Sequence, residues 1–162
     1  LPDTVEDGET LEANAIKKAT EVAAATGADA LADDTGLFVD ALGGRPGVRT
    51  ARYAGPDASD DDNRAKLLAE LEPSQDAGHR GAEFRTVMAL VRADGSRAVA
   101  EGRVAGTIST EPRGERGFGY DPLFVPSEGD GRTFAEMSLD EKQAISHRAR
   151  ALAALLTEIS GW

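Results

Sequence analysis

The chain of 162 residues contains no cysteine and only two histidines. The absence of cysteine excludes disulfides and thiolate metal sites, and two histidines disfavour a zinc site. Only oxygen and imidazole ligands remain for a metal. Because the chain is rich in aspartate and glutamate, a hard cation such as Mg²⁺ is the metal that its side chains suit.

Long apolar segments are also missing. No run of about 18 apolar residues exists, so we expect no membrane span. No signal peptide is recognisable, which indicates a cytoplasmic protein without a membrane partner. The phosphate-binding motif GxxxxGK[ST] is absent and excludes a P-loop NTPase. The chain begins with Leu1 rather than Met, so we expect it to start inside a longer reading frame.

Positive charge is scarce. The net charge is −11, and the only lysines are Lys17, Lys18, Lys66 and Lys142. An acidic surface repels phosphate backbones, so nucleic acid is not an expected partner. A small phosphate ligand would need local cations or a metal.

The remaining pattern alternates helices and strands, and the length fits one domain or two closely joined lobes. Thr10 is a good helix N-cap and Gly27 a good C-terminal residue. Asp94-Gly95 is typical of a hairpin turn, and 43–47 is expected to be a turn. We expect helices over 11–26, 60–71, from Ser138 and over 149–159, with Pro73 after the second, and strands over 28–32, 37–42, 84–92, 98–109 and 123–125. These elements predict an α/β fold with a mixed sheet.

The stretch Asp33-Asp34-Thr35-Gly36 follows a buried strand. Adjacent carboxylates on a strand point to opposite faces, so one can face an active site while the other orients the loop. A tight turn at Gly36 would let a phosphate or a metal approach the backbone. The alternative is a solvated Asp-Thr-Gly turn without a function.

A second group of acidic residues lies upstream. A Mg²⁺ site needs one or two protein carboxylates together with phosphate oxygens and water, and Glu6 with Asp34 would supply that pair. Lys17 or Lys18 would neutralise phosphate as a point charge. The alternative is that all of these are surface residues.

Two further clusters are distinctive. The glycine-rich loop 114–122 carries Phe118 and Tyr120, which either stack on a base or plug the loop into the core. A helix break before Ser146 would place His147 and Arg148 at the positive N-terminus of a second helix, where an anion or a keto oxygen can bind. A single continuous helix with exposed charges is the alternative.

Taken together, four stretches resemble the inosine/xanthosine triphosphate pyrophosphatase family. They are EDGETLEANAIKKA (6–19), ADDTGLFVDALGGRPGVRTARYAG (32–55), GFGYDP (117–122) and EKQAISHR (141–148). The resemblance implies an elongated α/β fold with a central mixed sheet, flanking helices and two lobes around a nucleotide cleft. It also implies Mg²⁺ dependence and a homodimer.

The resemblance assigns roles residue by residue. It implies that Asp34 is the proton acceptor and a metal ligand, Glu6 a metal ligand and Asp33 a supporting carboxylate. The implied substrate contacts are Thr35, Lys18, Phe118, Gly119, Tyr120, Asp121, Lys142, His147 and Arg148. Ala13 departs from the family, which usually has Glu there, and residues 1–162 do not include the [ST]xNxxK loop with which the family begins. We therefore expect residues 1–162 to form a single pyrophosphatase domain that is truncated at its N-terminus.

The expected reaction is Mg²⁺-dependent hydrolysis of the deaminated purine nucleotides ITP, dITP and XTP to monophosphate and pyrophosphate. Arg148 only donates hydrogen bonds. It would therefore donate to a 6-keto oxygen, whereas the 6-amino group of ATP offers it no acceptor. Two alternatives stay open: a Maf-like pyrophosphatase acting on pyrimidine or modified nucleotides, and a nucleotide-binding protein with impaired catalysis.

Overall fold

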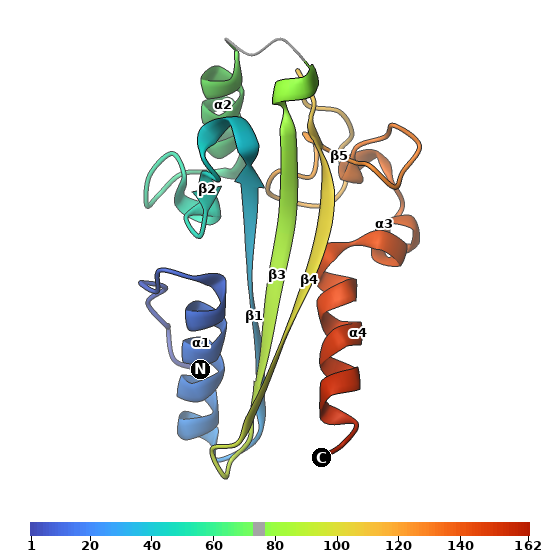
Figure 1. Ribbon diagram of the computed structural model, residues 1–162. Helices are drawn as coiled ribbons and strands as arrows, with labels where there is room; N and C mark the ends of the chain where they lie inside the picture. The colour runs from blue at the N-terminus through green and yellow to red at the C-terminus, as the bar shows by residue number, and fades with distance from the viewer. Residues whose placement is uncertain (73–76) are drawn as a thin grey trace. The chain divides into compact units, whose positions relative to one another are not determined.

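The computed structural model describes residues 1–72 and 77–162. The main elements follow one another along the chain as a mixture of helices and strands (Figure 1). They are α1 (Leu11–Thr26), β1 (Ala30–Val39), β2 (Pro46–Gly47), α2 (Asp60–Leu71), β3 (Gly81–Val91), β4 (Arg97–Ile108), β5 (Phe124–Pro126), α3 (Leu139–Ile145) and α4 (His147–Ile159). Short 3₁₀ helices lie at Asp40–Leu42, Thr50–Arg52, Ala77–His79 and Phe134–Glu136. No helix in the described part of the chain is both long and apolar enough to cross a membrane.

The five strands form one sheet in the order β2-β1-β3-β4-β5. The α/β fold with flanking helices is confirmed, but the sheet is antiparallel, whereas a mixed sheet is predicted above. The short turn between β3 and β4 requires this direction for that pair, because the five residues 92–96 are too few for the crossover that parallel strands need. At that turn Gly95 has a φ of 86°, and the amide of Arg92 donates to the carbonyl of Ser96 at 2.8 Å.

The acidic stretch lies inside a strand. β1 runs without interruption from Ala30 to Val39, so the prediction of two strands separated by a turn at Gly36 is wrong. Gly36 has another role: a Cβ there would lie 2.6 Å from the carbonyl oxygen of Gly47. Residues Leu37 and Gly47 pair directly, and the missing side chain at Gly36 lets β2 approach β1.

The first helix has the predicted bounds. The hydroxyl of Thr10 accepts the amide of Ala13 at 3.1 Å, and Gly27 closes the helix in the left-handed conformation. Ala13 has no side-chain oxygen or nitrogen with which to return the bond, so only half of a capping box is present. The helix buries a face of small residues, including Ala15 and Ala19, which allows close packing.

The other helices also follow their capping signals. α2 begins at a capping box between Ser59 and Asp62 and ends at Leu71, while Pro73 lies outside the described residues. α3 begins at the predicted box between Ser138 and Glu141. Ser146 has an extended backbone between α3 and α4, so the predicted break is confirmed and the single continuous helix is excluded.

Two compact units make up the chain. The first comprises Leu1–Thr35, Arg85–Arg103 and His147–Trp162. In it α4 packs on β3 and β4 through Met88, Ala98, Ala151 and Leu155. A Cβ on Gly102 would lie 2.1 Å from the carbonyl oxygen of His147, so this glycine sets how closely α4 packs on β4.

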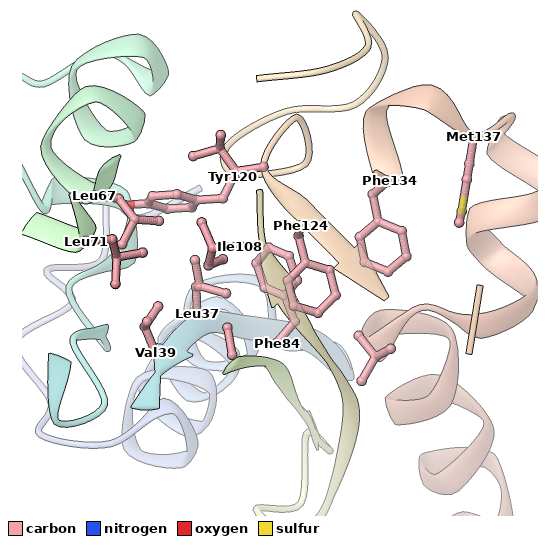
Figure 2. Packing of buried hydrophobic residues seen from close by; sticks show 13 residues of the cluster. Leu37, Val39, Leu67, Leu71, Phe84, Ile108, Tyr120, Phe124, Phe134 and Met137 are labelled. Atoms are coloured by element: carbon pink, nitrogen blue, oxygen red, sulfur yellow. The ribbon is translucent and has the colours of Figure 1, made fainter. Parts of the chain in front are cut away.

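The second unit comprises Gly36–Phe84 and Val104–Ser146 and holds the larger hydrophobic core (Figure 2). Three aromatic rings, those of Phe84, Phe124 and Phe134, lie with centroids 4.6 to 6.1 Å apart. The spacing is that of tilted and stacked aromatic pairs, which stabilise a core beyond the area they bury. The nucleotide cleft implied by the resemblance stays a prediction.

Candidate active site

Asp34 is the buried carboxylate of the first unit, with 8% of its surface exposed. Its Oδ2 accepts a hydrogen bond from the side-chain amide of Asn14 at 3.1 Å. Its Oδ1 accepts one from the ammonium of Lys18 at 3.2 Å. Both donors come from α1, and they lie four residues apart on one face of that helix. The carboxylate is therefore held at both oxygens by a single helix.

Lys18 joins Asp34 to the segment that precedes α1. Its Nζ lies 2.8 Å from Oε1 of Glu6, so one ammonium bonds two carboxylates. The neighbouring Lys17 bonds the carboxylate of Asp7 at 2.7 Å and the carbonyl of Val5 at 2.8 Å. Both lysines thus tie this segment to α1. Of the two lysines considered for phosphate binding, Lys18 is the one beside Asp34.

The electrostatics of the pair follow from burial. Loss of solvent raises the pKa of Asp34, an effect that the charge of Lys18 and the hydrogen bond from Asn14 only partly offset, while the charge of Glu6 adds to it. For Lys18, burial is the largest single influence and lowers the pKa. The hydrogen bond to Glu6 and the charges of Asp34 and Glu6 together outweigh it, so the pKa of Lys18 is raised. The lysine stays protonated, and Asp34 is a stronger base than an exposed aspartate.

The carboxylate oxygens beside Lys18 are ligands that suit a magnesium ion bound together with phosphate. Within residues 1–72 and 77–162 no group of three or more metal-binding side chains could hold an ion by itself. Glu6 and Asp34 provide two carboxylates, the number that Mg²⁺ takes when phosphate oxygens and water complete its shell. Because the Lys18 ammonium bonds both carboxylates, a metal bound to them would have to displace it.

Asp33 points to the other face of β1. Its Oδ2 accepts two hydrogen bonds from Arg148 on α4, from Nη2 at 2.9 Å and from Nε at 3.2 Å. The expectation that the two neighbouring carboxylates serve opposite faces is confirmed. Arg148 is exposed and Asp33 is only half-buried, so this ion pair contributes little to the stability of the fold.

Thr35 and His147 lie in the same unit. The hydroxyl of Thr35 shares a hydrogen bond of 2.7 Å with that of Thr86, which is fully buried. His147 is the first residue of α4 and is buried. The substrate contacts that the resemblance implies for both residues stay predictions.

The glycine-rich loop lies in the second unit, where its two aromatic residues differ sharply. Phe118 is 60% exposed, whereas Tyr120 is 3% exposed and belongs to the hydrophobic core. The hydroxyl of Tyr120 donates to the carbonyl of Thr50 at 2.8 Å. Tyr120 therefore plugs the loop into the core, whereas Phe118 is exposed, and its stacking on a base stays a prediction.

Lys142 and Asp121 support this exposed ring. Their side chains bond at 2.6 Å, and the same Asp121 oxygen accepts the amide of Phe118 at 3.1 Å. The Lys142 ammonium lies 5.0 Å from the centre of the Phe118 ring, within reach of a cation–π interaction. Gly119 is held from α2, where Asp60 accepts its amide at 2.7 Å and Arg64 donates to its carbonyl.

The predicted site residues thus form two groups. One lies in the first unit (Glu6, Lys18, Asp33, Asp34, Thr35, His147 and Arg148), and one in the second (Phe118, Gly119, Tyr120, Asp121 and Lys142). Asn14 is not among the residues predicted from the sequence, although it stands on the apolar face of α1 four residues before Lys18. A polar residue on a buried alanine-rich face is the signal that would have revealed it.

Comparison with known proteins identifies the family of this chain. A model of the Ham1 family matches residues 1–158, and the chain belongs to that family. Two curated relatives are both named dITP/XTP pyrophosphatase. The one from Geobacter sulfurreducens is 54% identical over all of this chain and 80% of its own length. The one from Streptococcus agalactiae is 47% identical over all of this chain, which spans 50% of that relative.

Solved structures give the same family. The Ham1 protein of Staphylococcus aureus matches with a TM-score of 0.89 and 40% identity, over 99% of this chain and 81% of that one. A structure from Mycobacterium abscessus, described as a nucleoside-triphosphatase or dITP/XTP pyrophosphatase, matches with a TM-score of 0.79 and 48% identity over 96% of this chain and 79% of that one. The family resemblance found in the sequence is confirmed.

Proposed function

We propose that this chain hydrolyses deaminated purine nucleoside triphosphates, namely ITP, dITP and XTP, to the monophosphate and pyrophosphate. The observation that carries the proposal is the buried carboxylate of Asp34, bonded to a lysine that also bonds Glu6, in a chain of the Ham1 family. The names of the relatives, dITP/XTP pyrophosphatase, support the substrate class.

In the proposed reaction a water oxygen attacks the α-phosphorus while Asp34 accepts the proton of that water. The bond between the α-phosphorus and the oxygen bridging to the β-phosphorus breaks, and pyrophosphate leaves with the electron pair. The raised pKa of Asp34 makes this carboxylate a better proton acceptor than an exposed aspartate. Lys18 offers the phosphates a positive charge.

Enzymes that cleave phosphoanhydrides generally work with a divalent metal, and we propose Mg²⁺ for this chain. Glu6 and Asp34 would hold it with the substrate phosphates. When bound, it would neutralise phosphate charge. The protein's own contribution is to orient Asp34 and to release the Lys18 ammonium toward the phosphates.

Base selection is proposed for Phe118 and Arg148. The open ring of Phe118 would stack on the purine, a contact worth roughly 1–3 kcal/mol in general. Arg148 donates to a 6-keto oxygen and finds no acceptor in the 6-amino group of adenine. A site that leaves such a group unpaired discriminates by about 10⁴ or more. Asp33 would keep the guanidinium oriented.

Release of pyrophosphate, rather than of phosphate, tests the proposal directly. The purified chain is assayed with ITP, XTP, ATP, GTP and dTTP, with Mg²⁺ and with a chelator. We expect turnover of the first two nucleotides only, lost with the chelator and restored by Mg²⁺. Preference for dTTP would favour the Maf-like alternative, and nucleotide binding without turnover would favour the impaired one.

Asp34→Asn is the matched control for contaminating activity, because it changes one atom in the site. Three further proposals rest on the family alone: a single pyrophosphatase domain, a homodimer and a cytoplasmic location. Light scattering of the purified chain tests the second of these.

A further inference from the structure

Asn14 is a fully buried polar residue of α1, with 0% of its surface exposed. Its side-chain oxygen accepts the backbone amide of Gly8 at 2.8 Å, and its side-chain nitrogen donates to Oδ2 of Asp34 at 3.1 Å. An amide group has one accepting and one donating end, so these two partners fix its orientation. The residue therefore connects the segment that carries Glu6 to the strand that carries Asp34.

The contact with Gly8 leaves no spare room. A Cβ on Gly8 would lie 2.5 Å from the Asn14 side-chain oxygen. The backbone thus approaches the amide as closely as a glycine allows. On the other side, Asn14 stands between the buried residues Leu11 and Ala15 of α1, which hold its backbone in place.

We propose that Asn14 is a positioning residue for the pyrophosphatase reaction, an inference that rests on the function proposed above. Its amide holds Oδ2 of Asp34 while Lys18 bonds Oδ1, so Asn14 still holds the carboxylate through Oδ2 when Lys18 moves toward the phosphates. Asn14 touches neither water nor nucleotide in this role. It acts through Asp34, which has to meet the attacking water with one defined oxygen.

A second buried asparagine supplies the comparison. Asn63 of α2 is nearly as deeply buried, and its side chain accepts the amide of Ala54 at 2.8 Å and donates to the carbonyl of Ala51 at 3.0 Å. Both of these partners are backbone groups, and neither belongs to the proposed site. A merely structural role for Asn14 predicts that the two asparagines respond alike to substitution.

The kinetic test compares Asn14→Leu with Asn63→Leu, since leucine has nearly the shape of asparagine without its hydrogen bonds. Both changes are expected to lower the melting temperature. Only Asn14→Leu should lower kcat for ITP, by about 10- to 100-fold as for other residues that orient a reactive group, with KM changed by less than about threefold. If Asn14→Leu does not fold, Gly8→Ala displaces the same amide from the side of Gly8 and should lower kcat in the same way.

A readout without turnover separates this inference from the proposed function. The side-chain amide signals of Asn14 in a ¹H–¹⁵N spectrum should shift in Asp34→Asn and stay in place in Asp33→Asn, because Asp33 points to the other face. If the wild-type chain releases no pyrophosphate, the proposed function fails and the amide spectrum alone decides on Asn14. Unshifted amide signals in Asp34→Asn, or a kcat within twofold of wild type in folded Asn14→Leu and Gly8→Ala, would overturn the positioning role.

Discussion

Asp33 and Asp34 are adjacent in β1 and bond side chains from two different helices. Asp34 accepts hydrogen bonds from Asn14 and Lys18 of α1, and Asp33 accepts hydrogen bonds from Arg148 of α4. Because the side chains of a strand alternate between its faces, one dipeptide supplies a buried carboxylate on one side and a half-buried partner for a guanidinium on the other. The same substitution at the two positions should therefore have different effects.

Asp34→Asn removes the proposed proton acceptor and should reduce kcat for ITP by about 10²–10⁴-fold, the range typical of general base catalysis. Asp33→Asn should leave kcat largely intact, raise KM and narrow the preference for ITP over ATP, because Arg148 loses its anchor. Steady-state kinetics of both variants with both nucleotides measures this. Equal losses of kcat in the two variants would contradict the assignment of Asp34.

The raised pKa of Asp34 predicts an acid limb in the pH profile. The carboxylate accepts a proton only when ionised, so kcat should fall as pH drops through a pKa above the ordinary 3.8. Stability should change in the opposite direction. Since the folded pKa exceeds the unfolded one, the contribution of Asp34 to stability is present at low pH and is lost as pH rises through the folded pKa.

Thermal unfolding from about pH 3 to about pH 7 tests whether the contribution of Asp34 to stability falls as the pH rises. The melting temperature of Asp34→Asn, relative to that of wild type, should rise across this window, because the asparagine carries no buried charge. A relative melting temperature that falls with pH would mean that the ionised carboxylate is net stabilised in the folded chain.

Phe118 and Tyr120 should separate binding from folding. Phe118→Ala removes an exposed ring and should raise KM for ITP by about 5- to 150-fold, the equivalent of 1–3 kcal/mol of stacking, with little change in melting temperature. Tyr120→Phe removes the bond to the Thr50 carbonyl and should destabilise the fold by about 1 kcal/mol with KM nearly unchanged. An unaltered KM in Phe118→Ala would refute stacking.

Gly102→Ala should loosen α4. The new methyl group would meet three backbone atoms of that helix within 2.8 Å, so α4 has to shift at a cost of roughly 1–3 kcal/mol. Arg148 lies on α4, and we expect KM for ITP to rise as well. Gly161→Ala meets no atom within 4 Å and serves as the matched control in unfolding and kinetic measurements.

Local signals were sufficient to predict much of this chain. α1 follows from Thr10 and Gly27, and the break at Ser146 follows from the capping signals around it. The opposite orientation of Asp33 and Asp34 follows from the period of a strand. In each case the responsible residues lie within a few positions of the feature that they define.

The parts that sequence reasoning missed depend on distant partners. Asp and Gly are poor strand formers, so Asp34 to Gly36 reads as a turn until the pairing of β1 within the sheet is known. The reason for Gly36 is the backbone of Gly47, which only the register reveals. The importance of Asn14 follows from its hydrogen bond to Asp34, 20 positions along the chain.

The uninterrupted course of β1 has a consequence for how such a chain can evolve. Inserting or deleting one residue between Ala30 and Asp33 would rotate every later side chain to the opposite face, and Asp33 and Asp34 would exchange partners. Point substitutions at Leu31, whose side chain is exposed, leave the alternation of side chains between the two faces intact. Lineages of this chain are therefore expected to vary in length at the Asp94–Ser96 turn, while the spacing from Ala30 to Asp34 stays fixed even where its residues change.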